Sequence, residues 1–425
     1  MRYIVFFVFA AFANRQVHAQ DAASIINSSE VKRIIEVLAS DEMQGRKAFT
    51  PAIDKAASFI AGEFKKAGLQ YFQKDNDYLQ TFELLKAVPQ HVSGTLNGEP
   101  IASENFVAIT TEALLQVNEN SGYEVVQIDS AANLFREAFP LLSQGKNYLV
   151  CVNNSHAKNF SRLQRLNREG FARNSSVIFV LTDTKPESFS FDIKNKIEAS
   201  SLANVIGVIP GKSKPGEYVI FSAHYDHLGI GKPDATGDSI YNGANDDAAG
   251  TTAMIMLAKY FSAVKNNERS LVFVAFTAEE SGGYGSQYFS RQIDAEKAIA
   301  MFNIEMIGTE SKWGTNSAYI TGYERSDFGK ILQESLAGSA FTFHPDPYPD
   351  QNLFYRSDNA TLAALGVPAH TISTSKMDSE PNYHKQSDEV KTLDIDNMTA
   401  IIKSIAISSK TIISGKATPS RVAKR

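Results

Sequence analysis

The sequence predicts an α/β protein with a mixed, mostly parallel central sheet flanked by helices and interrupted by an inserted, strand-containing subdomain. From residue 204 onward, apolar runs of strand length alternate with helical patterns, which is typical of a sheet covered on both faces. Between residues 89 and 200 the short apolar runs are separated by polar stretches instead. The length of 425 residues leaves room for both parts.

The first 19 residues are expected to form a secretory signal peptide. Arg2 supplies a positive start, residues 4–13 are apolar, and residues 17–19 (Val-His-Ala) offer a small-x-small cleavage site. The apolar run is too short for a finished transmembrane helix, and no other segment suggests stable membrane insertion. We therefore expect an exported protein, periplasmic or extracellular.

Residues 20–88 and 201–415 are assigned to one domain, residues 89–200 to the insertion, and residues 416–425 to a frayed basic tail. A helix between Thr50 and Gly68 has an N-cap candidate, proline at its first position and a glycine stop. Expected strands are 204–209, 218–223, 271–276, 298–304 and 367–372, and further helices are 248–264, 284–292, 327–336 and 395–413.

Composition excludes several classes of protein. The chain is 43% hydrophobic and 21% charged with a net charge of −5, which is ordinary for a globular protein and gives no indication of nucleic-acid binding. Its single cysteine rules out an internal disulfide, so an exported chain depends on its core or on metals for stability. Nothing in the sequence fixes the oligomeric state.

Acidic and histidine side chains gather where the expected strands end. One histidine follows strand 218–223, two glutamates follow strand 271–276, and a third glutamate follows strand 298–304. Open α/β sheets place their sites at the carboxyl ends of strands. The candidate site residues are His224, Asp226, Asp246, Glu279, Glu280, Glu305 and His384.

The candidate ligands are imidazoles and carboxylates. This mixture suits Zn²⁺, with Mn²⁺ or Co²⁺ as alternatives, and the lack of a cysteine ligand argues against a structural zinc site. Two histidines and three carboxylates are enough for two metals that share one carboxylate, as in two-metal hydrolytic sites whose ions lie about 3.5–4 Å apart.

Five stretches contain the candidate site residues: 222–226 (Ser-Ala-His-Tyr-Asp), 243–250 (Gly-Ala-Asn-Asp-Asp-Ala-Ala-Gly), 276–280 (Phe-Thr-Ala-Glu-Glu), 303–308 (Asn-Ile-Glu-Met-Ile-Gly) and 383–384 (Tyr-His) with Asp388. Together they resemble the family of secreted co-catalytic zinc aminopeptidases, whose relatives include glutamate carboxypeptidase and glutaminyl cyclase. The resemblance covers about 29–86 and 202–412 and omits the middle segment. It implies a zinc-exopeptidase-like fold, two zinc ions per chain and a peptide substrate with a free N-terminus.

The resemblance also implies a set of ligands. Asp246 would bridge both metals. His224 and Glu305 would complete one site, and Glu280 and His384 would complete the other. Glu305 departs from the family, where aspartate is usual at this position, but the longer side chain is still able to bind a metal.

Further roles follow from the same resemblance. Glu279 would act as the general base, taking a proton from the bridging water and returning it to the leaving amine. Asp226 would orient His224 and fix its tautomer. The peptide between Asp246 and Asp247 would be cis. His227, which follows Asp226 directly, is expected near the pocket rather than on a metal.

The sequence is compatible with three functions. An aminopeptidase with two zinc ions and a bridging water is the leading hypothesis. A carboxypeptidase or dipeptidase on the same site would need basic residues that recognise a free carboxylate. A non-catalytic binding protein on a peptidase scaffold would be expected to have broken motifs, whereas Glu279 and the five ligands are intact.

Overall fold

The computed structural model describes residues 22–72 and 76–425, and the predicted signal peptide lies outside these ranges. The chain divides into two compact units: residues up to Gln80 together with Ala203–Arg425, and the intervening Thr81–Leu202. The inserted subdomain was expected at 89–200. Two long strands, β2 (Leu79–Leu96) and β9 (Phe189–Ile209), carry the chain from one unit to the other and back.

The larger unit is built on a mixed sheet with the order β16-β15-β17-β14-β10-β13-β9. β10 runs parallel to both β13 and β14, and β14 runs parallel to β17, whereas β9 is antiparallel to β13. The predicted mixed, mostly parallel sheet is confirmed. The strands are β10 (Lys214–His224), β13 (Arg269–Phe276), β14 (Ala298–Ile304), β15 (Ser317–Ile320), β16 (Thr342–Pro345) and β17 (Ala369–Ser373).

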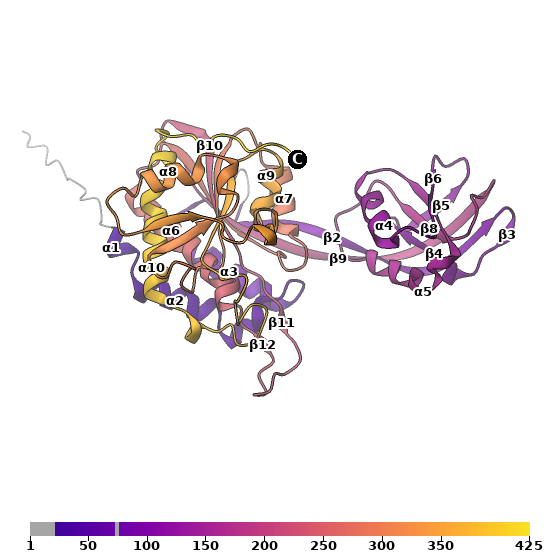
Figure 1. Cartoon of the computed structure of the whole chain (residues 1–425), viewed down its shortest axis with the longest axis horizontal. Coiled ribbons are helices and arrows are strands. Elements are labelled where there is room, and N and C mark those ends of the chain that lie inside the picture. The colour runs from indigo at the N-terminus through magenta and orange to yellow at the C-terminus, as the bar shows by residue number, and fades with distance from the viewer. Residues whose placement is uncertain (1–21, 73–75) are drawn as a thin grey trace, which may run out of the picture. The chain divides into compact units, whose positions relative to one another are not determined.

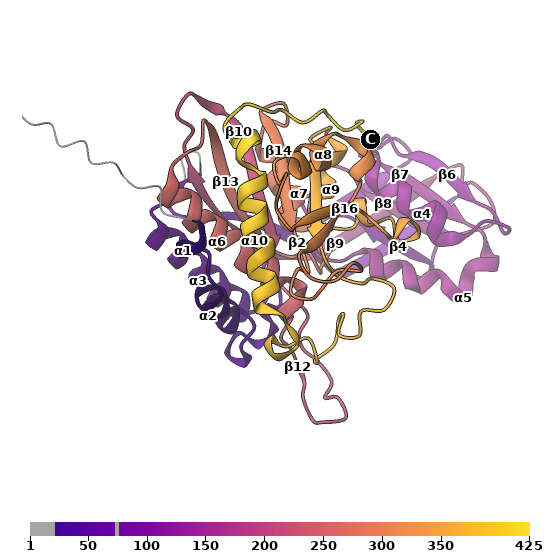
Figure 2. The same ribbon diagram turned by 60° about the vertical axis from the view of Figure 1, so that its left-hand side comes forward.

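Helices cover both faces of this sheet. Figure 1 shows α6 (Ala249–Val264) and α10 (Ile395–Ser408) on one side and α7 (Tyr284–Gln292) and α9 (Asn359–Ala364) on the other. Figure 2 shows α10 lying across its face of the sheet. Also packed on the α6 side are α2 (Ser28–Leu38), α3 (Pro51–Ala67) and α8 (Phe328–Glu334).

The core explains why the central strands read as unbroken apolar runs. Successive side chains of a strand point to opposite faces, and a strand covered on both faces must be apolar on both. In β13 the alternating residues enter two separate clusters: Leu271, Phe273 and Ala275 on the α6 side, and Val272, Val274 and Phe276 on the α7 side.

The ends of the chain elements follow local rules. α3 begins with Pro51 at its first turn and ends before Gly68, which has φ +72°, as predicted. The last residues do not fray as expected, because Val422 is buried among the residues of the α7-side core and Arg421 donates to the carbonyl oxygens of Ala295 and Ala298.

The smaller unit has its own sheet, ordered β4-β8-β7-β6. Strands β6, β7 and β8 are parallel and β4 is antiparallel to β8. Its elements are β4 (Phe106–Ile109), β5 (Leu114–Asn118), β6 (Glu124–Ile128), α4 (Leu134–Ser143), β7 (Tyr148–Val152), α5 (Ala157–Phe160) and β8 (Val177–Leu181).

Short elements complete the chain: α1 (Ala22–Ile25), β1 (Gln70–Tyr71), β3 (Glu99–Pro100), β11 (Gly229–Ile230), β12 (Ile240–Tyr241) and α11 (Lys410–Ile413). Across residues 22–72 and 76–425, no helix has both the length and the apolar character that crossing a bilayer requires.

Candidate metal centre

The sheet of the larger unit brings four of the predicted side chains to one edge. His224 is the last residue of β10, Glu305 directly follows β14, and the Glu279–Glu280 pair follows β13. Because β13 and β14 run parallel to β10 on either side of it, their carboxyl ends meet at the same edge. The approach of these residues is therefore a consequence of the strand order.

Asp246 reaches this edge from the loop before α6. The peptide between Asp246 and Asp247 is cis, as the resemblance implied. The carboxylate of Asp388 accepts hydrogen bonds from the main-chain N–H groups of Asn245 (2.8 Å) and Asp246 (3.0 Å). Asp388 is buried, so its structural contribution is to hold the loop that presents Asp246.

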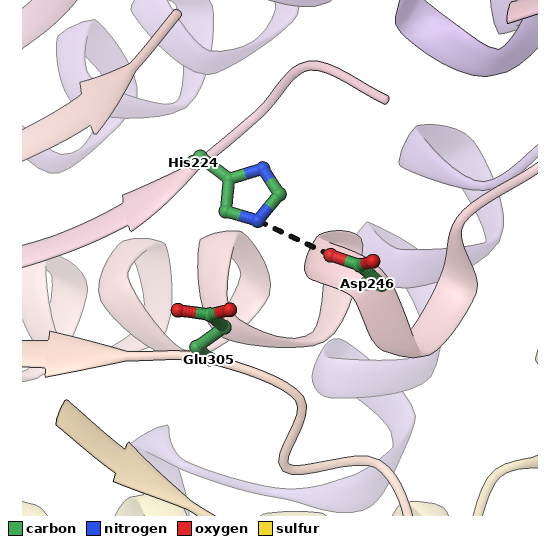
Figure 3. Close-up of side chains that lie close together, drawn as sticks. All are labelled: His224, Asp246 and Glu305. Carbon is green, nitrogen blue, oxygen red and sulfur yellow. Dashed lines mark ion pairs between the residues drawn. The ribbon is translucent and has the colours of Figure 1, made fainter. Parts of the chain in front are cut away.

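One donor set gathers around the first oxygen of Asp246. His224 Nε2 lies 3.2 Å from Asp246 Oδ1. Ligand atoms of His224, Asp246 and Glu305 all lie within 4.8 Å of one another. Figure 3 shows these three side chains turned toward a common point from β10, the short helical turn Ala244–Ala248 before α6 and the end of β14.

A second donor set gathers around the other oxygen of Asp246. His384 Nε2 lies 3.3 Å from Asp246 Oδ2 and 3.1 Å from Glu280 Oε1. His227 also belongs here, because its Nδ1 lies 3.0 Å from Glu280 Oε1 and within 4.8 Å of ligand atoms of Asp246 and Glu280. His227 was expected only near the pocket; a bridge between His227 and Lys47 holds it beside this donor set.

The donor atoms fit a cation better than they fit one another. Burying a polar atom without a partner costs free energy, so such atoms are rare in folded proteins. Here several make no hydrogen bond within the described part of the chain, although they face each other at the distances given above. They are His224 Nε2, His227 Nδ1, Asp246 Oδ2, Glu280 Oε1 and Glu305 Oε2. Imidazole nitrogens and carboxylate oxygens are the donors that zinc takes.

Asp226 holds the glutamate pair rather than acting on His224 alone. Its carboxylate accepts the main-chain N–H groups of Glu279 (3.0 Å) and Glu280 (3.3 Å). His224 Nδ1 lies within hydrogen-bonding distance of the main-chain carbonyl oxygen of Asp226 (3.2 Å). The nearer carboxylate oxygen of Asp226 is 3.8 Å from the same nitrogen. Asp226 thus fixes the turn after β13 with its side chain and contacts His224 through its main chain.

Glu279 is buried beside these donors. Burial raises the pKa of its carboxyl well above the ordinary value, despite the opposing effect of His224. Burial likewise raises the pKa of Glu305 to about 7. Carboxyl groups with raised pKa values in a pocket are suited to proton transfer near neutral pH, and a cation among them would favour their ionised forms.

Two buried groups behind the site had no supporting role assigned to them from the sequence. Asp247 accepts the main-chain N–H groups of His224 (3.3 Å), Gly250 (2.9 Å) and Met306 (3.0 Å), which ties β10, α6 and the end of β14 together. The guanidinium of Arg46 donates to four carbonyl oxygens, those of Leu38, Tyr225, Asn242 and Gly243. Both fix the backbone on which the donors stand.

A pocket opens over the donors. Arg356 is the one cation among its lining residues. Two residues further along the chain, the carboxylate of Asp358 is buried, and this burial raises its pKa to about 6. The apolar part of the lining includes Met306, Tyr319, Leu353, Met377 and Tyr383.

Part of the chain is similar in sequence to curated proteins. A probable leucine aminopeptidase of Trichophyton verrucosum is 31% identical over 208 residues, which is 46% of this chain and 53% of that protein. The chain thus matches about half the length of this curated relative.

Solved structures share the fold over most of the chain. An aminopeptidase from Aneurinibacillus sp. strain AM-1 has a TM-score of 0.54 at 17% identity, covering 94% of this chain and 96% of its own. A zinc aminopeptidase from Bacillus subtilis has a TM-score of 0.53 at 16% identity, covering 94% of this chain and 98% of its own. These likenesses establish the fold.

The similarity to a known family rests on sequence. Residues 204–407, just under half of the chain, match the model of peptidase family M28. This stretch includes every predicted metal ligand and Glu279, together with the strands β10, β13 and β14 that position them. Over these residues the chain is similar to peptidase family M28.

Proposed function

We propose that this protein is a zinc-dependent aminopeptidase that removes residues from the free N-termini of peptides with the help of two zinc ions. The observation that carries the proposal is the pair of donor sets that share the two oxygens of Asp246, with Glu279 beside them. The match of residues 204–407 to peptidase family M28 and the names of the similar proteins support it.

Zinc supplies Lewis acidity, which polarises a peptide carbonyl and makes water a better nucleophile at neutral pH. Within the chain, His224, Asp246 and Glu305 would hold one ion, and Asp246, Glu280 and His384 the other. Glu279 would take the proton from the attacking water and deliver it to the leaving amine nitrogen, so that one peptide bond is exchanged for a carboxylate and a free amine.

A carboxypeptidase or dipeptidase is the second candidate. Arg356 favours it, because a guanidinium in the pocket is a ready partner for the free carboxylate of a peptide. The same residue is compatible with an aminopeptidase that prefers an acidic side chain.

Three forms of one pentapeptide separate these activities: unmodified, N-acetylated and C-amidated. An aminopeptidase cleaves the unmodified and amidated forms and leaves the acetylated form intact. Cleavage of the acetylated form with the amidated form untouched would contradict the proposal and establish a carboxypeptidase. No cleavage of any form by zinc-loaded protein would favour the binding-protein hypothesis, and cleavage of dipeptides alone would establish a dipeptidase.

We also propose that the protein acts outside the cytoplasm after removal of residues 1–19, on the strength of the sequence pattern alone. Sequencing the N-terminus of the protein recovered from the growth medium or periplasm tests this, and Gln20 is the expected first residue.

A further inference from the structure

His227 is held rigidly next to the second donor set. Its side chain is buried, at 1% exposure for the residue, and its main-chain N–H donates to the carbonyl oxygen of Arg46 at 3.3 Å. A Cβ atom on Gly243 would lie 2.5 Å from His227 Cγ, so the glycine leaves the space that the ring occupies. The imidazole is therefore confined where it stands.

The contacts of His227 Nδ1 are those of a ligand rather than of a hydrogen-bond donor. The atom lies 3.0 Å from Glu280 Oε1 and 3.9 Å from Asp246 Oδ2. Within the described residues it nevertheless has no hydrogen-bond partner that meets the geometric requirements of a hydrogen bond. Donors around one tetrahedral zinc at about 2.0–2.1 Å lie about 3.3 Å from each other, which falls between the two distances.

His384 contacts the same two oxygens from the solvent side. Its Nε2 lies 3.1 Å from Glu280 Oε1 and 3.3 Å from Asp246 Oδ2, and its side chain is 37% exposed. The two imidazole rings meet edge to face with centroids 5.8 Å apart. One pair of carboxylate oxygens is thus approached by a buried imidazole and by an exposed one.

We propose that His227 is a further zinc ligand, through Nδ1, in the site formed by Asp246, Glu280 and His384. This inference rests on the proposed function and deepens it, because it makes the two metal sites unequal. One site has four protein donors, and the other has three: His224, Asp246 and Glu305. Closed zinc sites have four protein ligands, whereas catalytic sites have three and keep a position open. The ion beside His227 is therefore bound more tightly, and the open position belongs to the ion beside His224.

A chelator-competition titration of zinc measures the two affinities directly. Wild-type protein is expected to bind two equivalents that differ at least about tenfold in Kd. In His227→Ala the zinc affinity of the tighter site is expected to fall by about 10–100-fold or more. Substituting a residue that only hydrogen-bonds to a metal ligand already lowers affinity by this much. The weaker equivalent changes less. Both equivalents remaining within about threefold of wild type would overturn the proposal.

The matched control is His370→Asn. His370 is also buried, but its ring nitrogens pair with Ser326 Oγ at 2.7 Å and Thr321 O at 2.8 Å, in the α8-side packing away from the donors. Both zinc affinities of this variant should match those of the wild type. Equal losses in the two variants would mean that substituting any buried histidine disturbs the fold, and would overturn the specific assignment of His227.

A measurement on unaltered protein guards against a variant that fails to fold. In the Co²⁺-substituted wild type, proton NMR shows a strongly shifted imidazole resonance for each coordinated histidine. Three coordinated rings are expected, and two would contradict a role for His227. Wild-type protein that binds two ions and cleaves peptides while showing two rings defeats only this inference. Protein that binds no metal defeats the proposed function as well.

Discussion

Parallel strands end in polar residues in both units, but the outcome differs. In the smaller unit, Asp129 follows β6, Asn154 lies just beyond β7, and Asp183 lies just beyond β8. Asn154 donates through its main chain and its side chain to the two oxygens of Asp183, at 2.9 Å and 2.7 Å, and these groups are exposed. In the larger unit, several of the corresponding polar atoms are buried and make no hydrogen bond within the described part of the chain.

The difference teaches which polar strand ends indicate a functional site. Exposed groups that satisfy each other cost nothing to keep and need no ligand. Buried groups that converge without satisfying each other are tolerated when something else completes them. Polar residues follow the strands at both edges. The metal centre differs in that several of its polar atoms are buried and lack hydrogen-bond partners within the described residues.

The largest expected effect comes from removing the residue that both donor sets share. Asp246→Asn leaves one weak donor where two charged oxygens stood, so both zinc equivalents should be lost and kcat/KM should fall by about 10⁴-fold or more. Metal analysis after dialysis, together with peptide hydrolysis, checks this. Retention of two zinc ions by this variant would contradict the claim that the buried donors around Asp246 bind metal.

Glu279→Gln should separate chemistry from metal binding. Loss of the general base lowers kcat by about 10²–10⁴-fold, while zinc content stays at the wild-type value because Glu279 belongs to neither donor set. Glu280→Gln is the matched control, since it changes the adjacent residue and should reduce zinc occupancy. Near-normal turnover by Glu279→Gln would show that the proton is carried by another group.

Asp358 adds a dependence on pH. Burial raises its pKa from 3.8 to about 6, so the folded state favours the protonated carboxyl. The stabilisation is complete below about pH 3.8 and is lost as the pH rises through about 6. Asp358→Asn should therefore match the wild type near pH 4 and be more stable at pH 7 by about 2–3 kcal/mol.

Urea unfolding of chelator-treated protein at several pH values measures this difference, because no metal ion then acts on the carboxyl. A stability difference that does not change with pH would show that Asp358 is not titrating in this range. The paired Asp183 in the smaller unit should show no such behaviour.

The smallest effect is expected at the other edge. Asp183→Ala removes the partner of Asn154 on an exposed surface, so zinc content should be unchanged and kcat/KM should stay within about twofold of wild type. The same assays used for Asp246→Asn check this. A marked loss of zinc in this variant would mean that the edge of the smaller unit contributes to metal binding.

Much of the fold was predictable because the central strands obey local patterns. Runs such as 271–276 are apolar on both faces, and α3 is marked by Pro51 and Gly68. The metal donors were found because they follow those strands directly. The larger unit is therefore predictable where periodicity and strand ends coincide.

The supporting residues were not predictable in the same way. Asp388 and Arg46 have ordinary loop surroundings in the sequence, and their roles depend on burial against segments far along the chain. His227 was predicted to lie near the pocket. The short distance between its Nδ1 and Glu280 Oε1 depends on the folded chain and has no counterpart in the sequence. Likewise, the basic residues around Val422 predicted a frayed tail, whereas Val422 is buried in the core on the α7 side.

The most direct test of the central claim is the zinc content of the purified wild-type chain, measured by elemental analysis against protein concentration after equilibration with zinc and removal of the excess. The account predicts about two zinc ions per chain, one for each donor set around Asp246. A chain that retains no zinc would contradict it, since the buried, unpartnered donors would then need another explanation.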